Sequence, residues 1–258
     1  MIALNHIILR IFFRIVYWYI SIIDKKGEVL FMNYGYADSG FKLDLDPTDE
    51  KNRYAIQLYH LAASRITVLG KNILEVGSGR GGGLNYLCKT FNPASATGID
   101  LNEQAIRFCT RYYRDQRLKY MVSDAEHLLF KDQTFDVIFN IESSHGYPHM
   151  DKFLSEVYRV MKPGGFFAWA DFRPKTELES LDKLFLKANL HVVHKSIITQ
   201  PVLVALDLMK PAREEQIRNM IPWIFKGIAR RFVALEGTSM YNQFSDRKFE
   251  YVLYILQK

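Results

Sequence analysis

The chain has 258 residues, of which 48% are hydrophobic and 24% are charged, and its net charge is +6. This composition excludes a disordered, collagen-like or disulfide-scaffold protein and is typical of a globular chain with one large domain or two small ones. The basic residues form no dense stripe with interleaved aromatics, so we expect no nucleic-acid partner. The two cysteines, Cys88 and Cys109, show no metal-binding or disulfide spacing, which favours a cytoplasmic location.

The N-terminal segment is apolar but carries charge near its centre. Residues 7–23 read IILRIFFRIVYWYISII, in which Arg10 and Arg14 make a membrane span costly. On a helix, the polar residues of this segment form one narrow stripe beside a wide apolar face. That pattern predicts an amphipathic helix that either contacts a membrane peripherally or packs on its own domain. We assign residues 1–51 to this helix and a lid, and residues 52–258 to the main domain.

From Asn72 onward, short apolar runs alternate with helical segments, which is the rhythm of an α/β protein with a parallel sheet. A helix over Asn52–Thr67 precedes the first strand. The strands expected in this part are Asn72–Val76, Ala96–Ile99, Lys119–Val122, Phe135–Asn140 and Gly165–Ala170. The helices expected between them are Gly83–Phe91, Glu103–Arg114 and Met150–Met161.

The C-terminal third has a different pattern. Residues 175–231 are rich in apolar side chains at helical spacing, and we expect them to form a helical insertion that covers the substrate. Two apolar runs, Phe232–Glu236 and Phe249–Leu256, are predicted to be the last strands.

A glycine-rich turn follows the first predicted strand. Residues 73–83 read ILEVGSGRGGG, which includes the G-x-G-x-x-G spacing of dinucleotide-binding loops. However, Glu75 at the mouth of the loop would repel a pyrophosphate, and acidic residues also follow the next two strands, at Asp100, Asp124 and Glu126. A carboxylate that ends the second strand can bind both ribose hydroxyls of an adenosine. The acidic rim therefore favours a cofactor that carries a sulfonium and an ammonium group.

Candidate catalytic residues follow the fourth and fifth predicted strands. His145 comes shortly after the fourth, and Asp171 ends the fifth. The ends of neighbouring strands lie about 4.8 Å apart, so we expect the two side chains to pair. A histidine oriented by a carboxylate is a suitable base for an aliphatic hydroxyl, which is a poor nucleophile until its proton is removed. His149 is the second candidate, and a role of His145 in only capping the cofactor pocket stays open.

The order of these motifs resembles that of the class I S-adenosylmethionine-dependent methyltransferases. The matching segments are Glu75–Gly81, Asp100, Asp124–Glu126, Phe135–Ile138 and Leu154–Gly165. A narrower similarity is to the mycobacterial phthiotriolone/phenolphthiotriolone dimycocerosate methyltransferases, which O-methylate a long-chain lipid alcohol. The segments that carry it are Asn52-Arg53, Leu58–His60, Gly81–Gly83, Asn92–Ser95, Glu142–His149 and Ala170–Pro174. The resemblance covers about residues 30–175, and substrate identity does not carry over.

The resemblance implies a Rossmann-like fold, with a mostly parallel sheet, helices on both faces and a final antiparallel strand. It implies S-adenosyl-L-methionine as cofactor. From the residues themselves we expect no metal, since no cluster of metal-ligating residues is visible in the sequence. The glycines would contact the methionine part, Asp100 the ribose, and Asp124 with Ala125 the adenine. The full expected cofactor set is Glu75, Gly77, Ser78, Gly79, Gly81, Asp100, Leu101, Asp124, Ala125, Glu126, Asn140 and Tyr34.

The predicted activity is O-methylation of a hydroxyl on a lipid, polyketide or other apolar small molecule, with His145 and Asp171 as catalytic residues. Two alternatives stay open. One is C-methylation of a sterol, quinone or chromanol-like acceptor, and the other is a cofactor-binding regulator without transfer activity. The oligomeric state is open as well.

Overall fold

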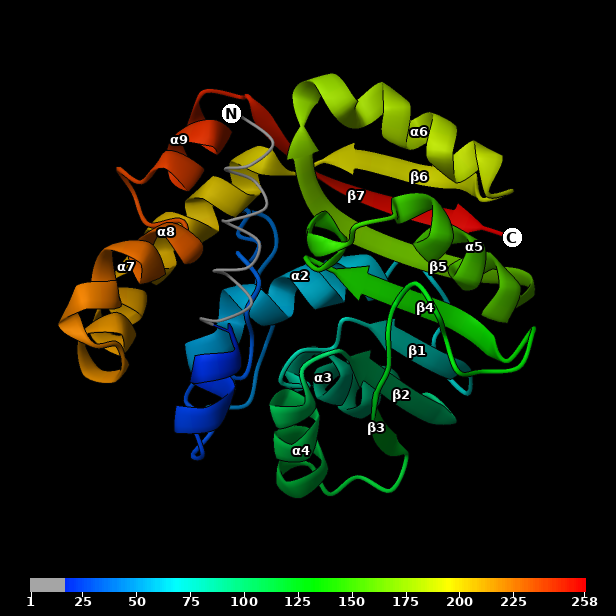
Figure 1. Cartoon of the computed structure of the whole chain (residues 1–258), viewed down its shortest axis with the longest axis horizontal. Helices are drawn as coiled ribbons and strands as arrows, with labels where there is room; N and C mark the ends of the chain where they lie inside the picture. Colours follow the sequence, from blue (N-terminus) through cyan, green and yellow to red (C-terminus); the bar gives the residue numbers. More distant parts are fainter. Residues whose placement is uncertain (1–16) are drawn as a thin grey trace.

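In the computed structural model, which describes residues 17–258, the fold is built on a seven-stranded sheet with the order β3-β2-β1-β4-β5-β7-β6 (Figure 1). The strands are β1 (Asn72–Val76), β2 (Ser95–Asp100), β3 (Leu118–Val122), β4 (Phe135–Ile141), β5 (Met161–Pro174), β6 (His191–Ile197) and β7 (Phe249–Gln257). The first five are parallel, and β7 runs antiparallel to β5 and β6. The predicted fold class is therefore confirmed.

Helices cover both faces of this sheet. They are α2 (Arg53–Ala63), α3 (Gly82–Phe91), α4 (Glu103–Tyr112), α5 (Met150–Val160), α6 (Leu178–Lys187), α7 (Thr199–Met220), α8 (Lys226–Phe232) and α9 (Ser239–Ser245). Side chains of α2, α3 and α7 share one core cluster, and those of α5 and α6 share another. Ile73 belongs to the first cluster and Leu74 to the second, because successive residues of a strand point to opposite faces.

The strand order reverses between β1 and β4, with β2 and β3 on one side and β5 on the other. In open α/β sheets, ligands bind outside the carboxyl ends of the strands at such a point. The glycine-rich turn and the predicted catalytic residues all follow strands at this edge.

The elements predicted between residues 52 and 174 are present, with ends that differ by four residues at most. Two predictions for the C-terminal part are wrong. Residues 175–231 are not helical throughout, because His191–Ile197 form β6 at the edge of the sheet. This strand buries little on either face, so it lacks the apolar alternation that identifies a strand in a sequence. Residues 232–236 form the end of α8 and a turn, and Leu235 packs among helices.

The described N-terminal residues pack against the C-terminal helices. Residues 17–23 are helical, and Ile20 shares a small core cluster with residues of α7 and α8. Figure 1 shows α7, α8 and α9 grouped on one side of the molecule, away from α5 and α6. The rest of the predicted amphipathic helix, with Arg10 and Arg14, lies outside the described residues. Within residues 17–258, none of the helices combines the length and hydrophobicity that a membrane span requires.

Candidate active site

The glycine-rich loop leads from β1 into α3 and lies against the end of β2. The backbone N–H groups of Gly77 and Ser78 both donate to the carbonyl oxygen of Ile99, each at 2.8 Å. Gly77 has a φ of 77°, and a Cβ atom at this position would stand 1.9 Å from Oγ of Ser143. Only glycine fits this backbone without displacing its neighbour. The loop therefore presents bare backbone to the edge of the sheet.

Asp100 ends β2 with its carboxylate facing this loop. The N–H of Gly79 donates to Oδ2 at 2.9 Å, and the N–H of Asn102 donates to Oδ1 at 2.8 Å. The Tyr17 hydroxyl also donates to Oδ2, at 3.4 Å, so the N-terminal helix reaches the same carboxylate. Burial raises the pKa of Asp100, and these hydrogen bonds oppose the rise. The carboxylate is placed where it can accept hydrogen bonds from ribose hydroxyls.

Five buried polar atoms have no hydrogen-bond partner within residues 17–258: Oε2 of Glu75, Oγ of Ser78, Nη1 of Arg80, Oγ of Ser123 and Oδ1 of Asn140. Oε1 of Glu75 accepts from the Tyr59 hydroxyl at 2.6 Å, and burial raises the pKa of Glu75 to about 8. Buried polar atoms without partners are rare in folded proteins, and they mark positions where a ligand or water completes the bonding. The loop is thus lined by groups that fit a polar ligand.

The acidic turn after β3 lies at the same edge but makes contacts of its own. Asp124 is exposed and accepts the N–H of Glu126 at 2.9 Å, and Ala125 between them is buried. Oε2 of Glu126 lies 2.8 Å from Nδ1 of His149, whose backbone N–H donates to Oε1. Leu101, one residue after β2, is exposed. The second histidine candidate is therefore bonded to a residue of the predicted cofactor set.

His145 and Asp171 form the hydrogen-bonded pair that the strand order predicts. Asp171 is fully buried in β5, and its Oδ1 lies 2.8 Å from Nδ1 of His145. Its Oδ2 accepts the backbone N–H of His145 and the hydroxyl of Ser144, both at 2.8 Å. Burial alone would raise the pKa of Asp171, but His145 and Arg173 hold it well below its usual range. An ionised carboxylate on Nδ1 orients the imidazole so that Nε2 is the atom that exchanges a proton.

Aromatic rings connect this pair to a cavity. The Phe172 ring stacks on the His145 ring with centroids 4.5 Å apart, and the Tyr34 ring stacks on Phe172 at 5.7 Å. The Tyr34 hydroxyl donates to the backbone oxygen of Phe232 at 3.1 Å. Tyr34, which was predicted to contact the cofactor, thus lies beside the His145 ring system and lines the cavity.

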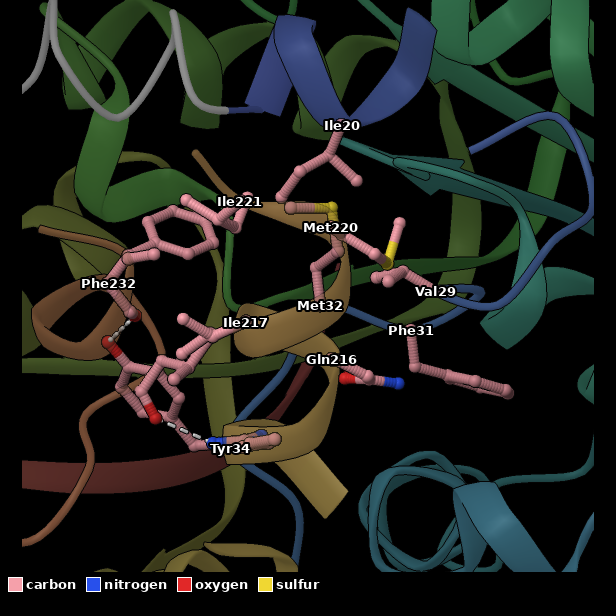
Figure 2. A pocket seen from close by; sticks show the side chains of 13 residues that line it. Ile20, Val29, Phe31, Met32, Tyr34, Gln216, Ile217, Met220, Ile221 and Phe232 are labelled. Atoms are coloured by element: carbon pink, nitrogen blue, oxygen red, sulfur yellow. Dashed lines mark hydrogen bonds between the residues drawn. The ribbon is translucent and has the colours of Figure 1, made fainter. Parts of the chain in front are cut away.

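The cavity lies between the N-terminal segment and helices α7 and α8, as Figure 2 shows. Its interior volume is about 80 Å³, below the roughly 300 to 1,000 Å³ of typical ligand pockets, so a lipid chain would have to move the lining side chains apart. Its lining residues are Ile20, Val29, Phe31, Met32, Tyr34, Arg213, Gln216, Ile217, Met220, Ile221, Ala229, Phe232 and Val233. Arg213 is the one charged residue among them. Such a lining suits an apolar chain with a polar end.

The guanidinium of Arg213 is held by backbone oxygens. Nη1 donates to Val233 at 2.7 Å, and Nη2 donates to Asn33 at 2.8 Å. Within the part of the chain that the structure describes, no carboxylate lies within 4.0 Å of it. Burial lowers the pKa of Arg213. Glu142 attracts this charge from a greater distance, and the Tyr34 ring centroid lies 6.0 Å from the guanidinium carbon. The cavity therefore contains a half-buried positive charge.

Glu142 is a residue of this site that sequence reasoning missed. It follows β4 with a φ of 51°, which is unusual for a residue other than glycine and is often found at functional sites. Its Oε2 accepts the N–H of Tyr34 at 2.6 Å and the hydroxyl of Tyr251 at 3.0 Å. Burial raises the pKa of Glu142 well above its usual value. The sequence did contain a signal for Glu142. An acidic residue at the end of a predicted strand is also the feature that identified Asp100.

A buried ion pair ties the N-terminal segment to the glycine-rich loop. Nη2 of Arg80 lies 3.0 Å from Oδ2 of Asp24, and the two side chains are 0% and 1% exposed. Arg80 also donates through Nε to the backbone oxygen of Val29 at 2.7 Å, and its guanidinium lies 3.7 Å from the centroid of the Phe108 ring. The segment at residues 24–34 is thereby held across the loop.

The groups at this edge match a nucleoside ligand with a polar tail. Asp100 can accept from vicinal hydroxyls, while Glu75 and Asn140 offer unpaired oxygens beside the bare backbone of the loop. Among residues 17–258, no group of three or more His, Cys, Asp or Glu side chains is arranged to hold a metal ion.

Comparison with known protein sequences gives matches along almost the whole chain. Residues 74–169 match the family described as a methyltransferase domain. The chain is 38% identical over 252 residues to the fatty-acid O-methyltransferase of Mycolicibacterium smegmatis, covering 95% of this chain and 89% of that protein. It is 36% identical over 245 residues to the phthiotriol/phenolphthiotriol dimycocerosates methyltransferase of Mycobacterium tuberculosis, covering 94% and 91%.

Solved structures with a similar fold are more distant in sequence. The geranyl diphosphate C-methyltransferase of Streptomyces coelicolor matches with a TM-score of 0.67 and 16% identity, covering 93% of this chain and 95% of that chain. The cyclase SpnF matches with a TM-score of 0.72 and 16% identity, covering 94% and 93%. Because the same fold carries a methyltransferase and a cyclase, this similarity establishes only the fold of the chain. The reaction has to be inferred from the residues of the site.

Proposed function

The chain belongs to the class I S-adenosylmethionine-dependent methyltransferases, and on that premise we propose that it methylates an oxygen atom of a long-chain lipid. The observation that carries the proposal is the His145–Asp171 pair, which lies beside an apolar cavity at the carboxyl edge of the sheet. Its relative from Mycolicibacterium smegmatis, named as a fatty-acid O-methyltransferase, supports the same choice of acceptor class.

The loop and its surroundings fit the cofactor. Bound S-adenosylmethionine supplies an electrophilic methyl group on a sulfonium. Asp100 would hold the ribose, the backbone at Gly77 and Gly79 would receive the methionine part, and Asp124 with Ala125 would border the adenine. The unpaired polar atoms around the loop support this assignment, because a ligand with a charged amino-acid tail supplies the bonding partners that they lack.

For a hydroxyl acceptor, the chain must supply a base. Nε2 of His145 would accept the hydroxyl proton, and Asp171 would stabilise the imidazolium that forms. Phe172 covers one face of the imidazole, which limits its motion and its contact with water. The cavity between the N-terminal segment and α7 would hold the apolar chain.

Arg213 favours a second acceptor, the carboxylate of a fatty acid. Glu142 attracts the guanidinium but forms no ion pair with it within 4.0 Å, so a carboxylate that enters the cavity could pair with Arg213 directly. A carboxylate is already ionised at pH 7, so it needs no base. His145 would then position the acceptor rather than remove a proton.

We further propose that residues 17–34 together with α7 and α8 act as the lid. Tyr17 contacts the carboxylate assigned to the ribose, Asp24 binds the glycine-rich loop, and the cavity lies between the two parts. The C-terminal part of this lid is shorter than the predicted lid over residues 175–231, because residues 175–197 contain α6 and β6 of the central fold.

Replacing Asp100 with alanine is expected to weaken cofactor binding. Loss of charge-assisted hydrogen bonds to the ribose corresponds to about 1.5 to 3 kcal/mol. Isothermal titration calorimetry with S-adenosylhomocysteine measures the change, and Asp151→Ala, at an exposed acid on α5, is the matched control. NAD should not bind to the wild-type protein. An unchanged affinity in Asp100→Ala would remove this residue from the site.

Replacing Arg213 with methionine is expected to distinguish the two acceptors. With fatty acids, KM should rise about 10- to 100-fold, because a charge-assisted hydrogen bond is lost. With a fatty alcohol of equal chain length, KM should change less than threefold. Mass spectrometry of the methyl ester and methyl ether measures both reactions, and Arg218→Met, at an exposed position on the same helix, is the control. Equal effects on both acceptors would contradict a role for Arg213 in binding the carboxylate.

A further inference from the structure

The turn between α7 and α8 exposes three consecutive large apolar side chains. Trp223, Ile224 and Phe225 form a short 3-10 turn, and they are 82%, 56% and 45% exposed. Single exposed apolar residues are common on protein surfaces, whereas a contiguous group marks a surface that another molecule covers. A tryptophan and a phenylalanine at the end of a projecting turn are suited to the boundary between lipid headgroups and acyl chains.

Positive charge surrounds this turn. Residues 216–235 contain four basic side chains, Arg218, Lys226, Arg230 and Arg231. They contain no acidic side chain, and the nearest in sequence are Glu214, Glu215 and Glu236 just outside this stretch. None of the four forms an ion pair with another residue in the part of the chain that the structure describes. Arg218, Arg230 and Arg231 are exposed, and Lys226 is half-buried. The charge complements an anionic surface, so a bilayer with acidic lipids is a better partner than a neutral one.

The same segment forms part of the cavity wall. Met220 and Ile221 precede the turn, Phe232 follows it, and all three line the cavity in Figure 2. The lining also includes Ile20, from the helical residues 17–23. A lipid that leaves a bilayer beside the turn would therefore meet the apolar cavity without crossing bulk water.

The neighbouring N-terminal helix adds to this surface. Ile20 shares a core cluster with residues of α7 and α8, so the two elements pack together. Trp18 and Ile22 on that helix are 52% and 36% exposed. Exposed apolar side chains thus come from two elements that border one cavity.

We propose that residues 222–226 insert into the headgroup region of an anionic bilayer and that the lipid acceptor enters the cavity from this side. Insertion of the turn is independent of the reaction, while entry of the acceptor rests on the proposed function. The apolar residues supply the insertion, and Lys226, Arg230 and Arg231 supply the attraction to acidic headgroups. Each basic residue near such a surface strengthens binding by about fivefold.

Co-sedimentation of the full chain with vesicles tests the insertion. The vesicles consist of phosphatidylcholine alone or mixed with phosphatidylglycerol. The wild-type protein should bind the anionic vesicles, and salt should release it. The variant W223S/I224S/F225S should lose at least about tenfold in binding, while L69S/L129S, which changes two equally exposed leucines elsewhere, should bind as the wild type does. Calorimetry with S-adenosylhomocysteine confirms that both variants are folded.

Tryptophan fluorescence locates the contact. Trp169 is fully buried, so in a Trp18→Phe background a change of emission reports on Trp223. Its emission should shift to shorter wavelength with anionic vesicles. An unchanged emission, or equal binding by W223S/I224S/F225S and the wild type, would overturn the proposal and leave the contact to other residues.

Activity separates this inference from the proposed function. On a short, water-soluble alcohol or acid, W223S/I224S/F225S should keep wild-type turnover, whereas on a long-chain acceptor in vesicles it should lose most of it. If the wild type methylates neither acceptor but still binds vesicles through Trp223, the proposed function fails and the docking surface stands. If turnover on vesicle-borne acceptor is unchanged in the variant, entry from this side is wrong.

Discussion

Replacing His145 with alanine is expected to lower kcat on an alcohol acceptor by about 10² to 10⁴-fold, the usual contribution of a positioned general base. The imidazole is bonded to a fully buried, ionised Asp171 at 2.8 Å, which fixes its orientation. Affinity for S-adenosylhomocysteine should stay within about twofold, because proton removal is not needed for cofactor binding. Mass spectrometry of the methylated product measures kcat at saturating acceptor.

Two control variants show whether the loss of turnover is specific to the His145 imidazole. His149→Ala removes an exposed imidazole that is bonded to Glu126, and it should cost less than about tenfold. Asp171→Asn should have a smaller effect than loss of the imidazole, because the base remains but is held less well. Wild-type turnover of His145→Ala on the alcohol would show that His145 only caps the cofactor pocket. A loss on the alcohol together with normal turnover on a fatty acid would point to the carboxylate as acceptor.

Replacing Arg80 with methionine is expected to lower the free energy of unfolding by about 3 to 5 kcal/mol. The substitution removes the cationic partner of Asp24, whose side chain is 1% exposed and whose carboxylate then keeps only the backbone N–H donors of Gly27, Glu28 and Val29. It also removes the bond from Arg80 to the backbone of Val29, so the segment across the glycine-rich loop loses an anchor. Urea denaturation followed by circular dichroism measures the change.

The chain offers a matched comparison for this ion pair. Arg107 pairs with Glu103 at 2.6 Å on the surface, with both side chains 57% exposed, and Arg107→Met should cost less than about 1 kcal/mol. The double variant Arg80→Met with Asp24→Asn should recover part of the stability, because the neutral amide leaves no unpaired charge and its Oδ1 can still accept the N–H groups of Gly27 and Glu28. If Arg80→Met costs no more than Arg107→Met, the buried pair does not hold the segment in place.

The local part of the site could be predicted from the sequence by itself. The turn at Gly77 requires a backbone conformation that glycine tolerates, and Asp100 ends an apolar run, so both mark the carboxyl edge of a strand. His145 and Asp171 follow neighbouring strands in the same way. Strand ends in a parallel sheet are one strand spacing apart, which makes their contact a consequence of strand order alone.

Only the tertiary structure decided which distant groups surround those residues. Arg80 meets Asp24 across 56 positions, Glu142 meets Tyr34 across 108, and Arg213 meets the backbone of Asn33 across 180. Strand β6 likewise became apparent only from its pairing with β7, because its side chains are too exposed to show the alternation of apolar and polar residues that predicts a strand. A periodic pattern reports which face of an element is buried, but not which segment buries it. The lid, the cavity and the position of Arg213 in it depend on which segments pack against each other, and only the packing of the whole chain determines that.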